Sequence, residues 1–169
     1  MEKAIIYTSN SGYTAQYAQL LAEKTGLTAF SSKEAKKKVP AGTKVIYLGW
    51  IMASNIKGYK DMVRQYDICA VCGVGMGASG SQIKEVRKAT KLPETVELFT
   101  LQGGFDINKL HGIYKLMMKI MIKTEAKALS QKQDRSKEEE DMLHMMLYGG
   151  NHVSEENLQG VLNWYHNWR

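Results

Sequence analysis

Short apolar runs alternate with helix-like patterns along the first 107 residues. Five runs have the length and composition of strands: Ala4–Tyr7, Leu27–Phe30, Lys44–Leu48, Ile68–Val74 and Val96–Leu101. Helical spacing of apolar residues predicts helices between them, near residues 13–24, 56–64 and 81–90. Strands that alternate with helices over short connections predict a doubly wound α/β fold around a parallel sheet.

Helical patterns without strands fill the rest of the chain. A long helix is predicted from Lys109 to about Ala128, with lysines at every fourth position from residue 115 to residue 127. Its apolar residues are placed together on one side: Leu110, Ile113, Tyr114, Met117, Ile120, Met121 and Thr124. After a polar hinge, Ser136 and Glu139 fit a capping box that opens a second helix.

The second helix is expected to stop at Gly149–Gly150, and a last helix is expected to begin near Ser154. We therefore expect an α/β domain over residues 1–131. We expect residues 132–169 to form a C-terminal helical pair, packed on or beside that domain.

Length and composition narrow the class of protein. The 169 residues contain only two cysteines, and no apolar run approaches the ~20 residues of a membrane span. Residues 1–3 lead directly into the first strand-like run, so no signal peptide is expected. These observations predict a soluble, cytoplasmic protein.

The charge is unevenly distributed. The chain carries a net charge of +6. Residues 1–131 contain 19 basic and 10 acidic side chains and carry +9, whereas residues 132–169 contain 4 and 7 and carry −3. Such a basic unit suits an anionic substrate, an acidic partner or peripheral contact with a membrane. No RNA-binding aromatic motif accompanies the lysines, so a nucleic-acid partner is not expected.

Small polar residues connect the first strand to the first helix. The connection consists of Thr8, Ser9, Asn10, Ser11, Gly12, Tyr13 and Thr14. Free N–H groups and the positive end of the helix dipole make such a place an anion site, where hydroxyl groups complete the hydrogen bonds to a phosphate. The Gly-Lys-Ser/Thr ending of nucleotide triphosphatases is missing. The alternative interpretation is a polar turn that caps the helix.

The residues around this loop stand at the spacing of the flavodoxin signature. The matching positions are Ile5, Ile6, Tyr7, Ser9, Gly12, Thr14, Ala18 and Leu21. The chain therefore resembles a flavodoxin over about residues 1–131. The resemblance implies a five-stranded sheet of order 2-1-3-4-5, with FMN as cofactor and its phosphate in the loop of residues 8–14. Tyr13 stands where the family usually has an asparagine.

Two further loops follow the third and fourth strands, at the edge where ligands bind such sheets. In flavodoxins these loops enclose the flavin ring. The resemblance assigns to them Trp50, Ile51, Met52, Ala53 and Ser54, and Gly73, Val74, Gly75, Met76 and Gly77. An indole or a thioether supplies flat or soft apolar cover for a ring. The alternative interpretation makes Trp50 and Met52 ordinary packing residues.

Two other motifs are weaker. Residues 75–80 match Gly-x-Gly-x-x-Gly, but they follow the fourth strand rather than the first, so a dinucleotide site is not expected. Residues 102–106 resemble the corresponding loop of flavodoxin-domain, quinone-dependent protoporphyrinogen oxidases. That resemblance bears on the molecule that meets the flavin.

No catalytic side chain and no metal site are expected. Cys69 and Cys72 lie three residues apart in a strand, so they should point to opposite faces as two buried thiols. The four histidines show no metal-ligand spacing. Met142, Met145 and Met146 are predicted to form the core face of a helix.

The leading expectation is an FMN-binding redox protein that passes electrons between partner proteins. A flavin oxidoreductase acting on a quinone, a tetrapyrrole or a similar flat substrate is the alternative. Carrier flavodoxins are typically acidic, so the +9 of residues 1–131 is a departure from the family. A third alternative, from another class, is a non-redox basic module that binds an anionic surface. The sequence leaves the oligomeric state open.

Overall fold

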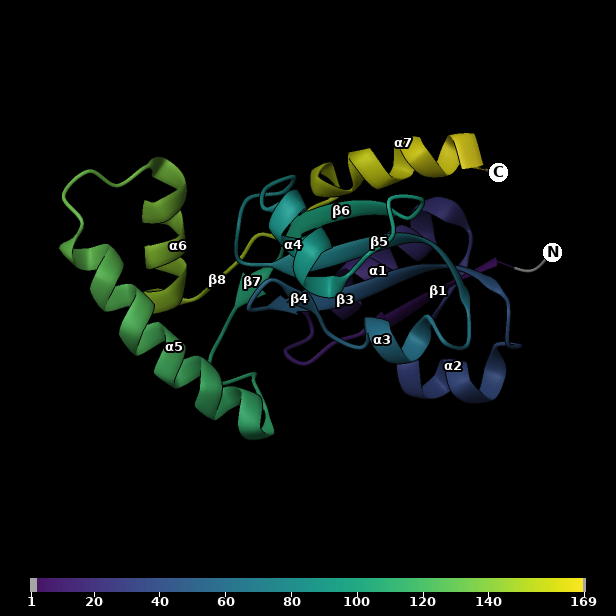
Figure 1. The fold of residues 1–169 in the computed structure, drawn as a ribbon, viewed down its shortest axis with the longest axis horizontal. Helices are drawn as coiled ribbons and strands as arrows, with labels where there is room; N and C mark the ends of the chain where they lie inside the picture. Colours follow the sequence, from purple (N-terminus) through teal and green to yellow (C-terminus); the bar gives the residue numbers. More distant parts are fainter. Residues whose placement is uncertain (1–2, 169) are drawn as a thin grey trace.

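Five parallel strands form the centre of the molecule (Figure 1), and the short strand β4 (Asn55–Ile56) joins them as a sixth, antiparallel strand. The computed structural model describes residues 3–168. The strands are β1 (Lys3–Thr8), β2 (Thr28–Ser31), β3 (Lys44–Met52), β5 (Asp67–Gly75) and β6 (Glu97–Gln102). Their order is β2-β1-β3-β5-β6, and every neighbouring pair is parallel. The predicted α/β class and parallel sheet are confirmed.

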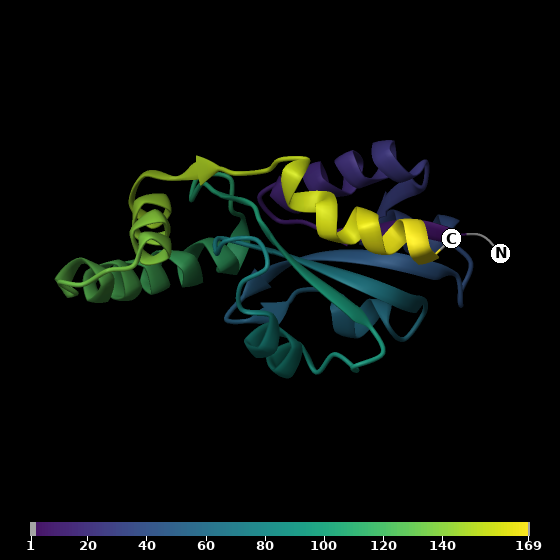
Figure 2. The ribbon, with the colours of Figure 1, turned by 90° about the horizontal axis from the view of Figure 1, so that it is seen from above.

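Helices cover both faces of this sheet (Figure 2). One face is covered by α2 (Ser32–Lys38), α3 (Tyr59–Met62) and α4 (Ile83–Thr90), and the other by α1 (Tyr13–Thr25) and α7 (Gln159–Trp168). The alternation of a strand explains the two cores. In β1, Ala4 and Ile6 belong to the first core, whereas Ile5 belongs to the second.

A cluster of hydrogen bonds holds the segment before α7 against α1. The Tyr17 hydroxyl of α1 donates to the carbonyl of Gln102 and accepts a hydrogen bond from Asn157 Nδ2 at 2.7 Å. Asn157 lies in η1 (Glu156–Leu158), a 3₁₀ turn directly before α7. Burial raises the pKa of Tyr17, so this hydroxyl stays protonated as a donor.

Two helices leave the sheet as an arm, which we define as residues 112–148 (Figure 1). The arm consists of α5 (Gly112–Gln131) and α6 (Lys137–Tyr148), which pack against each other. At its base, β7 (Gly104–Phe105) and β8 (Gly150–Asn151) pair as antiparallel strands. The expected pair of helices in residues 132–169 is therefore divided: α6 packs on α5, and α7 packs on α1, because β8 returns the chain to the sheet.

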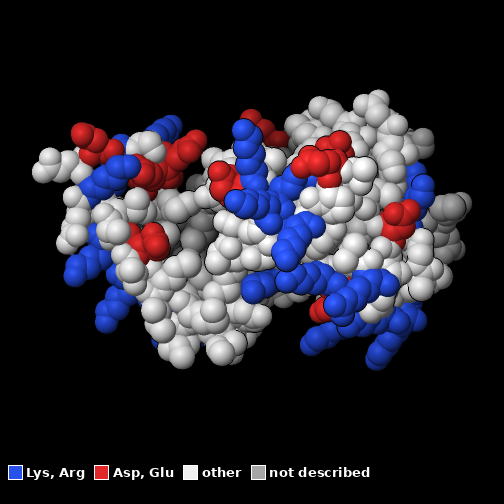
Figure 3. All heavy atoms as spheres, in the orientation of Figure 1, with Lys and Arg blue, Asp and Glu red and all other residues white. Residues whose placement is uncertain are grey.

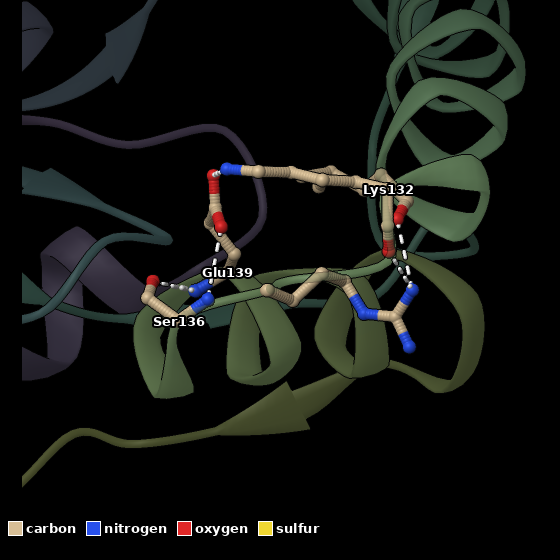
Figure 4. Close-up of polar contacts among 5 residues, drawn as sticks. Lys132, Ser136 and Glu139 are labelled. Carbon is tan, nitrogen blue, oxygen red and sulfur yellow. Dashed lines mark hydrogen bonds and ion pairs between the residues drawn. The ribbon is translucent and has the colours of Figure 1, made fainter.

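The turn between α5 and α6 is tightly bonded (Figure 4). Ser136 Oγ accepts from the Glu139 N–H at 3.2 Å and the Glu139 carboxylate accepts from the Ser136 N–H at 3.0 Å, so the predicted capping box is confirmed. Lys132 Nζ donates to Glu139 Oε1 at 2.6 Å. Arg135 donates to three carbonyl groups at the end of α5, those of Leu129, Ser130 and Lys132.

Three local elements differ from the sequence expectation. The third strand extends to Met52 and pairs with β4 (Asn55–Ile56), so the helix expected over residues 56–64 shortens to α3. The helix α2 was not expected, because Ala35 is its only buried residue and gives no apolar periodicity.

Among residues 3–168, no helix is both long enough and apolar enough to cross a membrane.

The two cysteines differ in their surroundings. Cys72 is fully buried and burial raises its thiol pKa to about 12, whereas Cys69 is only half-buried. The pairing of β3 with β5 is irregular beside Cys69, which disrupts the strict alternation. As a result, Cys69 lines a groove with Trp164 and Trp168 of α7, the same helix that packs on the core containing Cys72. The expectation of two buried thiols is wrong for Cys69.

Candidate functional site

A cavity of about 210 Å³ lies at the carboxyl edge of the sheet, between its loops and the arm. Residues from all three predicted loops line it: Ser11, Tyr13 and Thr14; Trp50, Ile51, Met52, Ala53 and Ser54; and Val74, Gly75, Met76 and Gly77. These loops are far apart in the sequence. They meet because β1, β3 and β5 are parallel neighbours whose carboxyl ends share one edge.

The first loop brings the beginning of α1 to the cavity. Gly12 precedes the helix with a φ of +99°, a left-handed conformation that glycine adopts without a steric penalty. The N–H groups in the first turn of an α-helix have no partner within the helix, and this turn begins beside Ser11 and Thr14, which line the cavity. Thr14 is almost completely buried, with 2% of its surface exposed.

Other residues of this loop are engaged elsewhere. Thr8 Oγ1 accepts a hydrogen bond from the Tyr47 hydroxyl at 2.8 Å. Ser9 Oγ accepts from the Gly12 N–H at 3.1 Å, and Asn10 Oδ1 accepts from the His111 N–H at 3.1 Å. The side chains of Thr8, Ser9 and Asn10 therefore hold the loop and the start of the arm, and they do not line the cavity.

Tyr13 has a packing role at one end of the cavity. Its side chain is buried against β7, where the ring leaves no space for a Cβ atom on Gly104. Lys109 Nζ lies 5.3 Å from the centre of the ring, at the distance of a cation–π contact. The ring therefore joins the first loop to the base of the arm.

The second loop is a strained hairpin turn. Met52 pairs with Asn55, and the two residues between them, Ala53 and Ser54, have φ angles of 48° and 61°. A two-residue turn with both φ angles positive normally favours Asn-Gly. Gln82, which also lines the cavity, has a φ of 58°. Three of the four non-glycine residues with positive φ among residues 3–168 thus border this cavity, and such strain concentrates at functional sites.

Apolar side chains form most of the wall. Trp50 packs edge-to-face on Tyr114 of α5, with ring centres 4.9 Å apart. Met52 and Met76 belong to the same apolar cluster as Trp50. The Ile51 side chain lies over Gly73 and Gly75, where a Cβ atom on Gly73 would lie 2.9 Å from it. Gly73 therefore makes space for Ile51, whereas a Cβ atom on Gly75 would lie in ordinary contact with it at 3.4 Å. Gly73 does not line the cavity.

The arm supplies residues that the sequence did not assign to a site. Leu110 precedes α5, Met118 and Met121 lie on α5, and Met142 lies on α6, and all four line the cavity. Gln82, Gly104 and Phe105 complete its lining. Met145 and Met146 are buried as predicted, but Met142 faces the cavity. A helical pattern shows that a methionine faces inward, but it does not show which surface lies opposite.

The lining contains few reactive groups. The described residues around the cavity include no Asp, Glu, Lys, Arg, His or Cys. The hydroxyl groups of Ser11, Tyr13 and Thr14 therefore have no acidic or basic side chain beside them in the lining. Within residues 3–168, no group of His, Cys, Asp and Glu is placed to hold a metal ion. The largely apolar lining is suited to binding a largely apolar molecule.

The fold and the cavity define a class: a doubly wound α/β protein with a cavity at the carboxyl edge of a parallel sheet. No model of a known protein family matches the chain, and no curated protein matches it.

Proposed function

We propose that the protein binds FMN at this cavity and transfers electrons between redox partners. One observation carries the proposal: the three loops that the flavodoxin resemblance selects line a single cavity, although they are separated in the sequence. The strand order β2-β1-β3-β5-β6 is that of a flavodoxin-like sheet, whose known ligand site lies at the same edge.

The residues present fit both ends of FMN. Ser11, Thr14 and the free N–H groups at the start of α1 would hold the phosphate, in a place where the helix dipole favours an anion. Trp50, Met52 and Met76 would flank the ring with apolar surface. At about 210 Å³ the cavity is smaller than the roughly 300–1,000 Å³ of typical ligand pockets, so part of FMN would lie outside it.

Bound FMN supplies the reversible uptake and release of electrons. The chain's own residues would bind and orient the cofactor, and the arm would keep water from one side of it. Because no charged residue lines the cavity, the phosphate would be held by dipoles and hydroxyl groups.

A titration tests this proposal. Adding the purified protein to FMN should quench the flavin fluorescence, and riboflavin, which lacks the phosphate, should bind more weakly. Thr14→Val removes one hydrogen bond to a charged group, worth about 1.5–3 kcal/mol, so it should weaken FMN binding roughly 10- to 100-fold. The same variant should leave riboflavin binding almost unchanged.

Thr28→Val is the matched control, because Thr28 is exposed on β2, away from the cavity. It should not change either affinity. A protein that fails to quench FMN contradicts the proposal and favours a non-redox basic module. Equal losses for FMN and riboflavin in Thr14→Val contradict the phosphate assignment alone.

A second candidate is a flavin oxidoreductase that acts on a flat apolar substrate such as a quinone or a tetrapyrrole. The observation that favours it is the soft wall of Met76, Met118, Met121 and Met142, which suits a second flat molecule beside a flavin. FMN-loaded protein should then consume a soluble quinone over many turnovers when a reductant is supplied. A carrier exchanges electrons with a partner protein and leaves the quinone unreduced.

A further inference from the structure

The arm carries an exposed apolar strip on α5, and its residues do not line the cavity. The apolar strip consists of Ile113, Leu116, Met117 and Ile120, with 68%, 60%, 44% and 61% of their surfaces exposed. Their spacing of i, i+3, i+4 and i+7 places them on one face over two helical turns. They are four of the seven large apolar side chains exposed in residues 3–168, so exposed apolar surface is concentrated there.

Lysines continue and border this strip. Lys119 follows Leu116 by three residues, Lys123 follows Ile120 by three, and Lys127 follows Lys123 by four, and all three lysines are exposed. Figure 3 shows basic side chains projecting from the edge of the arm where α5 runs, while most acidic ones of the arm gather at its opposite edge. The single acid of α5, Glu125, lies about 120° around the helix from Ile113.

We propose that the apolar strip and its lysines dock on the surface of an anionic phospholipid bilayer, with α5 lying in the plane of the interface. The apolar side chains would enter the boundary between headgroups and acyl chains, and the ammonium groups would remain beside the lipid phosphates. Met118 and Met121, about 140° and 80° around the same helix from Ile113, line the cavity, so docking would bring the cavity close to the lipid surface.

A second copy of the chain is a poorer occupant of this face. The strip is about 11 Å long and consists of four partly exposed side chains, which offer only a fraction of the about 800 Å² that each partner buries in a stable protein interface. Two copies joined face to face would also bring their lysines together, and like charges across an interface oppose association. An anionic lipid surface matches both the apolar and the basic part of the face.

Vesicle sedimentation tests the docking and does not depend on FMN binding. The full chain should sediment with vesicles of phosphatidylglycerol and phosphatidylcholine, and only weakly with phosphatidylcholine alone. The variant Lys119→Gln/Lys123→Gln should bind the anionic vesicles about 25-fold more weakly, since each lysine near an anionic surface contributes roughly fivefold. The matched control Lys36→Gln/Lys37→Gln removes the same charge from exposed positions on α2, and it should lose little.

A second pair of variants tests the apolar part. Leu116→Ser/Ile120→Ser should weaken binding at least tenfold, whereas Val63→Ser, at an exposed apolar position near α3, should not. Circular dichroism melting should show that all variants stay folded, because every substituted side chain is exposed.

Three results would overturn the docking proposal. The first is equal loss of vesicle binding in the α5 and α2 lysine variants, which would mean that net charge alone, and not the position of the lysines, determines binding. The second is equal binding to neutral and anionic vesicles, or to neither. The third is a Leu116→Ser/Ile120→Ser variant that keeps its vesicle binding but loses self-association in sedimentation velocity, which assigns the strip to a second copy.

Discussion

Ser54 and Lys91 adopt the same left-handed backbone conformation in different surroundings. Their φ angles are 61° and 59°. Lys91 ends α4, where its N–H donates to the carbonyls of Arg87 and Lys88, so helix capping accounts for its conformation. Ser54 lies in the turn that lines the cavity, so its strain accompanies the shape of the site.

Glycine at either position should stabilise the fold. Left-handed backbone costs a non-glycine residue about 1–2 kcal/mol, and the greater freedom of glycine in the unfolded chain offsets part of the gain. We expect Ser54→Gly and Lys91→Gly each to raise the free energy of unfolding by about 0.5–1 kcal/mol. Only Ser54→Gly should also weaken FMN binding, because it loosens the cavity wall. Urea denaturation and FMN titration measure both effects, and weaker binding in Lys91→Gly would contradict this interpretation.

At the level of single residues, the sequence predicts much of the cavity lining but not the local hydrogen bonds. Loops at the ends of neighbouring parallel strands meet at one edge, so strand position and the flavodoxin resemblance together assign Ser11, Thr14 and Trp50 to a site. Ser9 and Asn10 have the same polar character, yet their side chains bind nearby N–H groups. The choice between a ligand and a neighbouring N–H group depends on three-dimensional contacts that composition does not encode.

At the level of elements, α5 shows why a helix face is difficult to predict. The sequence groups Ile113, Met117 and Ile120 with Tyr114 and Met121 on one apolar side. In the structure the first three are exposed, whereas Tyr114 and Met121 are half-buried toward the cavity and its cluster. An apolar helix with two apolar sides has no clear periodicity, so only its surroundings distinguish the buried side from the exposed one.

The stability of the turn between α5 and α6 should depend on pH. The hydrogen bond from Lys132, followed by that from the Ser136 N–H, lowers the pKa of Glu139 below its usual 4.5. Because folding favours the ionised form, the stabilisation is complete above the usual pKa and is lost as the pH falls through the lowered one. Lys132→Ala should raise the pKa of Glu139 toward its usual value in an NMR titration of the carboxyl carbons.

Glu34 provides the internal control for this titration. It occupies the same capping-box position in α2, where hydrogen bonds from Ser31 are the main cause of its lowered pKa. Lys132→Ala should therefore leave Glu34 unchanged. An equal shift of both carboxyl groups would mean that general charge, and not the Lys132 contact, sets the pKa of Glu139.

At the scale of the whole molecule, the arm and α7 are two separate structural units, whereas the sequence predicted one C-terminal pair of helices. Leu158, Val161, Leu162 and Tyr165 are all buried on the sheet face shared with α1. At about 1.5–3 kcal/mol each, their burial contributes roughly 6–12 kcal/mol. That is comparable with the entire stability of a typical domain, about 5–15 kcal/mol.

Two shortened chains should therefore behave differently. A chain ending at residue 131 loses α7, and it should show no cooperative thermal transition in circular dichroism. A chain in which Asn-Gly replaces residues 106–149 keeps α7, because Phe105 and Gly150 are paired neighbours that a two-residue turn can join. We expect this second chain to melt cooperatively. The opposite pattern would mean that the arm, and not α7, completes the fold.

The position of α7 after the arm also has a consequence during synthesis. The strands and α1 leave the ribosome long before α7, and the whole arm is made between them. Until α7 arrives, the apolar face around Ile46, Ala70 and Leu101 lacks part of its cover, and such transiently exposed surface promotes aggregation. The arm thus lengthens the interval in which this face of the nascent sheet is incompletely covered.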